Sequence, residues 1–422
     1  MNAAVLHRAE LDFLGRYEGL RDRLPGDPAT RAAAAAAFRA AGLPTLRDEA
    51  WKYTNLRALA EGGFSEPLVS IDGCAALLAR VPATPGARLV FVDGRYRDDL
   101  SVAPDRAVAG GFAASPCFGP LARPDEHPLV ALNAMLAEDG IVLDVPTGVD
   151  AGTVQLVSLA TDQHGRPVTF HPRHRVRLAA GARLTLFEVS LGEGVYLHNP
   201  VAEISVADGA ALVHVRLQEE ADAAYHLSTV YAEVAAGGVY DAFTLTTGGR
   251  VVRTEFHARL SAPGGAVHLN GAQLLAGRQV ADFTSVVSHD APHCASRQTV
   301  KNVLAGRSRG VFQSRIEVAR AAQKTDGYQM NQALLLSPEA EIDSKPELEI
   351  FADDVKCSHG ATVGELDADQ LFYLRARGIP QAQARAMLVR AFLAEALDLV
   401  ADPDVRASLE ERMAGWWERH EA

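Results

Sequence analysis

A repeat of about 28 residues is the feature of this sequence that most restricts how the chain can fold. Five glycines follow one another at intervals of 29, 28, 28 and 28 residues: Gly152, Gly181, Gly209, Gly237 and Gly265. Around them, segments such as 203–206 and 213–217 alternate apolar and polar side chains, which is typical of strands. Each repeat therefore predicts two strands joined at a glycine turn. No long helical pattern separates the repeats, as a βαβ sheet would require.

A sequence period of this length is typical of a solenoid, in which each coil buries its inner face only by stacking on its neighbours. We therefore expect a mainly β protein with a right-handed parallel β-helix as its core. A β-sandwich with coincidental glycine spacing is the alternative. The glycine register stops after Gly265, although strand-like segments continue beyond it.

Helical patterns flank the repeat. Residues 3–24 carry apolar side chains at helical spacing, Asp27 before Pro28 is a typical helix start, and Gly42 is a typical stop. A strand is expected over residues 88–93, and helical spacing returns after residue 364. We divide the chain into a helical and mixed N-terminal region over 1–145, a β-helix core over 146–363 and a C-terminal helical domain over 364–422.

Composition excludes several classes of protein. The chain has 41 basic and 53 acidic side chains, whereas nucleic-acid binding favours a basic surface. No stretch approaches the roughly 20 apolar residues that span a bilayer, and residues 1–19 mix both charges, unlike a signal peptide. The four cysteines, Cys74, Cys117, Cys294 and Cys357, form no CxxC pair, which is typical of reduced thiols. We expect a cytoplasmic protein that binds neither nucleic acid nor membrane.

The densest polar cluster lies at residues 351–362 and contains Cys357 and His359. In a strand these two side chains point to the same face, with Cα atoms roughly 6.5–7 Å apart. A thiolate and an imidazole at that distance can bind one borderline or soft metal ion. A closed structural zinc site needs four ligands, and nothing nearby offers the other two. The pair is therefore half a site at most, unless it is simply a half-buried cysteine and a surface histidine without a joint role.

A second cluster contains His289, His293 and Cys294, which are residue types that bind metals. Pro292 leaves the directions of these side chains unset, so a polar loop between coils is the simpler interpretation. A nucleophilic Cys–His pair would also need an orienting third group, and nothing places Asp290 in that role. The sequence contains no GxxxxGK[ST], GxSxG or HExxH motif, so it predicts neither P-loop ATP binding nor those hydrolytic chemistries.

Several longer segments resemble a known family. They are Lys324–Ser337 (KTDGYQMNQALLLS), Ala352–Gly364 (ADDVKCSHGATVG), Leu371–Leu374 (LFYL) and the early block Glu49–Thr54 (EAWKYT). Together they resemble the SufB/SufD family of iron–sulfur cluster assembly proteins, and the early block is similar to its SufD branch. The SufB branch has a cysteine in the strand that here contains Met330, and an acidic-His-acidic triplet in the later strand where this chain reads Lys356-Cys357-Ser358-His359. The roles of the SufB branch are therefore not transferred.

The resemblance implies a scaffold subunit without enzymatic activity of its own. Such a chain pairs with a SufB-like subunit through the ends of their β-helices, and the nascent iron–sulfur cluster forms transiently at that junction. Cys357 and His359 fall on the family's junction residues, and no cluster is expected to stay bound to the isolated chain, which can form a homodimer. The C-terminal helices would dock a SufC-like ATPase. The expected docking residues are Leu371, Phe372, Leu374, Met387, Leu388 and Phe392.

Two other functions compete with this expectation. One is a secreted-type β-helix lyase or epimerase that acts on polysaccharide, although an aromatic content of 6% is low for sugar stacking. The other is a self-contained metal-binding protein that uses His289, His293 and Cys294.

Overall fold

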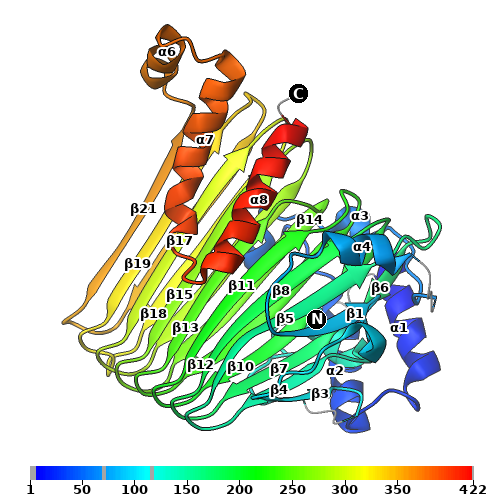
Figure 1. Ribbon diagram of the computed structural model, residues 1–422. Helices are drawn as coiled ribbons and strands as arrows, with labels where there is room; N and C mark the ends of the chain where they lie inside the picture. Colours follow the sequence, from blue (N-terminus) through cyan, green and yellow to red (C-terminus); the bar gives the residue numbers. More distant parts are fainter. Residues whose placement is uncertain (1–5, 69–72, 115–117, 421–422) are drawn as a thin grey trace.

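Two long sheets wind through the computed structural model, which describes residues 6–68, 73–114 and 118–420. Each coil of the chain contributes one strand to each sheet, and the ladders between coils are parallel (Figure 1). The predicted parallel β-helix is therefore confirmed. One sheet has the order β2 (Arg95–Tyr96), β1 (Ala87–Val92), β5 (Asp150–Ala160), β8 (Arg183–Gly192), β11 (Ala211–Glu219), β13 (Val239–Thr246), β15 (Ala266–Leu275), β17 (Ala295–Leu304), β19 (Asp326–Leu335) and β21 (Lys356–Gly364).

The second sheet faces the first across the solenoid interior. Its order is β20 (Glu341–Ile350), β18 (Arg309–Val318), β16 (Val280–His289), β14 (Val251–Leu260), β12 (Tyr225–Val234), β10 (Val201–Val206), β7 (Arg173–Leu178), β4 (Ile141–Val145) and β3 (Val108–Gly111), with β6 (Val168–Phe170) and β9 (Tyr196–His198) beside this path. Because β1 and β4 already belong to these sheets, the solenoid begins inside the region that the sequence assigns to 1–145.

The glycine repeat marks one corner of the solenoid. Gly181, Gly209 and Gly237 occupy this corner with φ between 60° and 68°, a left-handed conformation that glycine adopts without the cost of a Cβ. Gly152 also has a positive φ, but it lies at a register shift inside β5, and Gly148 holds the corresponding corner. At the fifth corner the left-handed residue is Gly264 rather than Gly265. The corner then continues without glycine, because His293 and Lys324 take φ of 60° and 62°.

A backbone ladder explains why that corner persists. The N–H of Gly264 donates to the carbonyl of Pro292 in the next coil at 3.2 Å, and the N–H of His293 donates to Gln323 at 2.9 Å. Each corner residue is thus held by the coil above it. The same corner geometry therefore continues in later coils where glycine no longer occupies the corner.

The interior is packed with rows of apolar side chains that stack from coil to coil. Phe256, Phe283 and Phe312 form one such row, with ring centroids 5.6 and 6.3 Å apart. All three are at most 2% exposed. Ring pairs of this kind add specific contact energy to the burial of their area, so the column stabilises the stacking of coils.

N-terminal helices cover the outer face of the second sheet. They are α1 (Arg8–Leu20), α2 (Pro28–Ala41), the 3₁₀ turn η1 (Glu49–Trp51), α3 (Arg57–Ala60) and α5 (Pro128–Leu136), while α4 (Cys74–Arg80) and η2 (Asp98–Leu100) lie near β1. Asp27 accepts hydrogen bonds from the N–H groups of Ala29 and Thr30, so the predicted start of α2 is confirmed. Of the predicted helix 3–24, residues 3–5 lie outside the described ranges.

The C-terminal helices are α6 (Ala368–Ala376), α7 (Gln381–Leu397) and α8 (Pro403–His420). Helices α7 and α8 lie along the outer face of the first sheet (Figure 1), where Leu393 and Trp416 share one apolar cluster with Leu274 and Val303. They therefore complete the solenoid's outer surface instead of enclosing a core of their own. Helix α6 projects beyond the sheets and contains no buried residue.

Cys74, Cys294 and Cys357 are free thiols, and Cys117 lies outside the described residues. Within the described ranges, none of the helices combines the length and apolar character required to cross a bilayer.

Candidate functional site

The last coil leaves one edge of each sheet unpaired among the described strands. β21 and β20 are the terminal strands, and they pair only with β19 and β18 respectively. The N–H of Lys356 donates to the carbonyl of Thr325 at 2.8 Å, on the β19 side. Because successive residues of a strand direct their N–H groups to opposite sides, Cys357, His359 and Ala361 direct theirs to the open edge.

The open edge of β20 is interrupted by a proline. The N–H groups of Glu341 and Phe351 donate toward β18, to Ser308 and Val318. By the same alternation, Pro346 stands where an N–H would face outward, and proline has none to offer. β21 is therefore the edge with the continuous row of free donors.

Cys357 and His359 lie on the same face of β21, as the sequence predicts. They stand opposite Gly327 and Gln329 of β19, two positions that face the solenoid interior. Cys357 is half-buried against an apolar cluster that contains Ile316, whereas His359 is exposed because no further coil covers it. The two residues thus form part of the last, uncovered layer of the interior.

Electrostatics keep the Cys357 thiol protonated in the isolated chain. Burial raises the pKa of this thiol above its ordinary value. A metal ion reverses that preference, because a coordinated thiol is held as the thiolate. In the isolated chain the Cys357 thiol is therefore expected to ionise only if a metal ion coordinates it.

The interior below His359 is polar. Gln329 donates to the hydroxyl of Ser314 at 2.8 Å, and Ser314 donates in turn to Gln298 at 2.6 Å, with Ser285 also bonded to Gln298. The Gln329 side-chain oxygen has no hydrogen-bond partner among the described residues. A row of hydrogen-bonding groups thus ends directly under the exposed imidazole.

The structure separates the three residues of the second predicted cluster. His289 is fully buried and bonds Ser296 through Nε2 at 2.9 Å, and burial lowers its pKa to about 4. His293 is exposed at the left-handed corner, and Cys294 is buried with its thiol bonded to the carbonyl of Ala262. The ligand clusters found among the described residues do not include these three. Their side chains point in different directions because His289 ends β16, His293 lies at the corner and Cys294 follows that corner. The sequence alone did not determine this arrangement.

The residues expected to dock an ATPase differ in exposure. Phe372 and Met387 are 73% and 42% exposed, whereas Leu371, Leu374 and Leu388 are half-buried. Phe392 faces the solenoid: its ring lies 4.5 Å from the Lys301 amino group, which also bonds its carbonyl. Phe392 therefore fixes α7 to β17. The exposed members of the expected docking residues lie on α6 and in the first half of α7.

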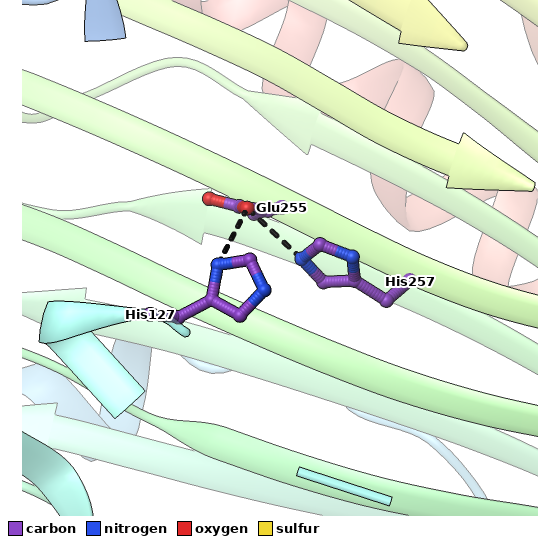
Figure 2. Close-up of side chains that lie close together, drawn as sticks. All are labelled: His127, Glu255 and His257. Atoms are coloured by element: carbon purple, nitrogen blue, oxygen red, sulfur yellow. Dashed lines mark hydrogen bonds and ion pairs between the residues drawn. The ribbon is translucent and has the colours of Figure 1, made fainter. Parts of the chain in front are cut away.

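Sequence reasoning missed two separate clusters of histidine and glutamate, and both involve strands of the second sheet. The first is His127, Glu255 and His257, whose ligand atoms lie within 4.8 Å of one another (Figure 2). Glu255 and His257 share the outward face of β14, which the pattern Glu-x-His indicates. His127 precedes α5 and is more than a hundred residues away in the chain, so no spacing in the sequence could have identified it.

The second cluster is enclosed. Glu220 lies 3.1 Å from Nδ1 of His198 and 2.6 Å from Nδ1 of His226, and all three side chains are at most 2% exposed. Burial opposes ionisation of Glu220, but His226 and His198 hold its pKa well below the ordinary value. Gln218 donates to the same carboxylate. This group is a buried network in which two histidines stabilise one carboxylate.

Comparisons with known proteins identify the chain. The family model described as SUF system FeS cluster assembly, SufBD core domain, matches residues 159–392. The chain belongs to the SufBD family. Its relatives include the iron–sulfur cluster assembly protein SufD of Escherichia coli, 35% identical over 88% of this chain and 89% of that protein. A SufBD family protein of Synechocystis is 30% identical over 85% and 84%, and the chloroplastic protein ABCI7 of Arabidopsis thaliana is 29% identical over 98% and 94%.

The family match covers the solenoid from β5 to α7 and includes the open end. The chain is thus a SufD-like iron–sulfur cluster assembly protein, which agrees with the resemblance found in its sequence. Membership in this assembly family argues against the polysaccharide lyase.

Proposed function

We propose that this chain is a non-catalytic scaffold subunit of a SUF complex, and that it pairs with a SufB-like subunit through the open end of its solenoid. Unpaired strand edges are templates on which another chain can add. Apolar side chains surround this end: Ile350, Phe351 and Val363 are 39%, 68% and 55% exposed. A partner that continues the two sheets would cover these residues and pair the free N–H groups of β21.

At the proposed junction, Cys357 and His359 contribute half of a binding site for the nascent cluster, which is the cargo of the complex. Thiolate and imidazole are ligands that iron accepts. The partner and the cluster's own sulfide supply the remaining ligands. The observation that carries this proposal is the position of the thiol and the imidazole together on the uncovered last layer of the interior.

We further propose that α6 and the start of α7 dock a SufC-like ATPase. Phe372 and Tyr373 are 73% and 56% exposed on a helix that buries nothing. A large exposed apolar group on a projecting helix favours a protein partner. Since α7 and α8 are fixed to the sheet, movement of the ATPase at α6 can be transmitted to the solenoid as a rigid body.

An edge-blocking variant tests the proposed pairing. Ala361→Pro removes a donor that faces the open edge and leaves the ladder to β19 intact, so the chain should fold and lose at least about tenfold in affinity for a SufB-like subunit. Ala361→Val keeps the N–H and is the matched control. Calorimetric titration of the two purified subunits measures the difference. Unchanged affinity in Ala361→Pro would rule out strand addition at β21.

The role of the ligand pair is tested separately. His359→Ala should pair with the SufB-like subunit normally, because its N–H is kept, yet fail to assemble a cluster in the reconstituted complex. Iron and sulfide analysis with the visible absorption of the cluster gives the yield. A yield equal to that of the unsubstituted chain would refute the role of His359.

The same open edges allow two copies of this chain to pair when the partner is absent. Light scattering of the isolated chain should then give the mass of a dimer, and Ala361→Pro should give that of a monomer. A dimer that survives this substitution would use another surface.

A further inference from the structure

A group of metal-binding side chains lies on the outer face of the second sheet, away from the open end of the last coil. Glu255 and His257 project from β14, and His127 reaches them from the residue before α5 (Figure 2). Nε2 of His257 lies 2.9 Å from Oε1 of Glu255, and Nδ1 of His127 lies 3.9 Å from the same oxygen. The two imidazole rings have their centroids 4.6 Å apart. Three potential ligand atoms thus converge on one point.

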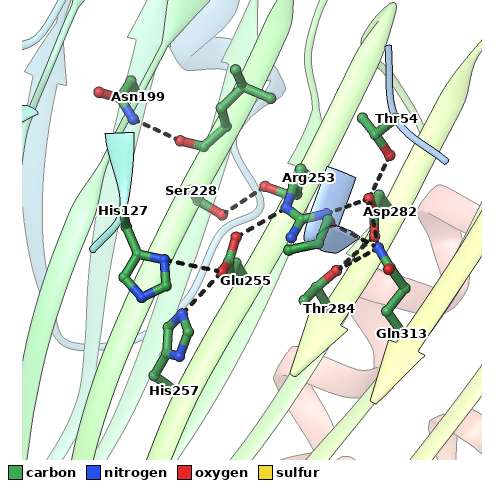
Figure 3. Close-up of polar contacts among 12 residues, drawn as sticks. Thr54, His127, Asn199, Ser228, Arg253, Glu255, His257, Asp282, Thr284 and Gln313 are labelled. Atoms are coloured by element: carbon green, nitrogen blue, oxygen red, sulfur yellow. Dashed lines mark hydrogen bonds and ion pairs between the residues drawn. The ribbon is translucent and has the colours of Figure 1, made fainter. Parts of the chain in front are cut away.

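Glu255 is positioned by its other oxygen. Oε2 accepts a hydrogen bond from Nε of Arg253 at 2.9 Å, which leaves Oε1 to face the two imidazoles (Figure 3). Arg253 is itself fixed, because it also pairs with Asp282 and its guanidinium lies 4.1 Å from the ring centre of Trp51. Outer partners of this kind orient the first ligands of metal sites.

The buried carboxylates beside the group outnumber the guanidinium that pairs with them, which favours a cation. Glu255 and Asp282 are both buried carboxylates, and Arg253 is the guanidinium that both of them contact. Two negative charges therefore share one positive charge at this buried place, and an uncompensated buried charge is costly.

The group also opens to solvent on one side. A groove of about 340 Å³ is lined by both histidines together with Tyr231 and Glu126. Three arginines also line this groove, of which Arg259 pairs with Asp290 and Arg315 pairs with Glu317. The side chains of His127 and His257 are 30% and 19% exposed. Three protein ligands beside an open groove leave positions for water or for an exchanging ligand, unlike a closed structural site.

We propose that His127, Glu255 and His257 bind a divalent transition-metal ion, of which ferrous iron and zinc are the candidates. Two imidazoles and one carboxylate with open positions suit either ion. The hard cations Mg²⁺ and Ca²⁺ prefer sites built from oxygen ligands. This site is separate from the cluster position at Cys357 and His359 and stands whether or not that position is correct.

Metal titration of the full chain tests the site. Protein stripped with a chelator is titrated without oxygen by calorimetry, with Fe²⁺, Zn²⁺ and Mg²⁺ in separate runs. His127→Ala and His257→Ala should each weaken binding of the transition metal at least about tenfold. His268→Ala is the matched control, because its Nδ1 lies 3.9 Å from Oδ1 of Asp241 without a second histidine.

Each outcome is decisive. Loss of Fe²⁺ or Zn²⁺ affinity in the His127 and His257 variants, with binding kept in His268→Ala, supports the site and shows which ion it prefers. Absence of transition-metal binding, equal binding of Mg²⁺, or an equal loss in His268→Ala would overturn it. Thermal unfolding checks each variant. If His257→Ala does not fold, His127→Ala decides, since His127 is the most exposed of the three ligands and precedes its helix.

Discussion

Removal of the Trp416 side chain should release α8 from the solenoid without unfolding the solenoid. Trp416 is 1% exposed and belongs to the apolar cluster that joins α7 and α8 to the first sheet. Truncation of a buried tryptophan to alanine costs about 3–5 kcal/mol. Because α8 packs on the outside of the first sheet and contributes no strand to it, this loss falls on its docking equilibrium and not on the coils.

Two features of the site set the magnitude. Trp416 borders a groove of about 480 Å³ between α7 and α8, so water can enter the space that the ring leaves, and the cost falls at the low end of that range. Its indole N–H has no hydrogen-bond partner among the described residues, and its removal returns roughly 1 kcal/mol. The net cost is about 2–3 kcal/mol, equivalent to roughly a 30- to 150-fold shift toward the undocked helix.

Hydrogen exchange followed by mass spectrometry measures this shift. In Trp416→Ala, amides of α8 should lose protection by that factor, while those of β11 to β19 stay unchanged. Phe372→Ala is the control, because it removes an aromatic ring of which 73% is exposed. A loss of protection below about threefold in α8, or an equal loss throughout the solenoid, would refute the reasoning.

Three further predictions follow from single positions. Phe372→Asp on α6 should abolish binding of a SufC-like ATPase in a pull-down. Val108→Asp, at a 65% exposed position on β3, is the control and should not affect that binding. Retained binding in Phe372→Asp would place the docking surface elsewhere. His293→Gly should raise the free energy of unfolding by up to about 1 kcal/mol, because a left-handed φ of 60° strains any residue with a Cβ, and a destabilised variant would contradict this. Burial lowers the pKa of His289 to about 4, against 6.5 in the unfolded chain, so below pH 6.5 the unfolded state binds a proton that the folded state does not. Stability should therefore fall by about 3 kcal/mol between pH 6.5 and 4, and urea denaturation of His289→Gln should show a smaller decline over that window than the unsubstituted chain.

Rules that act between neighbouring residues were sufficient to predict much of this protein's structure. The period of two places Cys357 and His359 on one face before any coordinates are known, and the glycine spacing gives the coil length. Asp27 before Pro28 marks a helix start because the capping contacts span only three residues. In each of these cases the interacting groups are neighbours in the chain, or the constraint repeats along it.

Other features depended on residues that are distant in the sequence. His293 and Lys324 occupy the corner that glycine fills in earlier coils, because the ladder to the next coil holds them there. The apolar faces of α7 and α8 indicated burial but not the surface that covers them. His127 meets Glu255 only because the residue before α5 lies against the outer face of β14.

The sequence alone determined the family, the coil and the pair of potential ligands in the last strand, because periodicity and motif order are properties of neighbouring residues. Only the tertiary structure decided that this strand is the uncovered one, that the C-terminal helices cover the first sheet, and that two histidines and a glutamate converge on the second. Those arrangements depend on which surfaces meet when the coils stack, and contacts between distant segments have no fixed spacing along the chain.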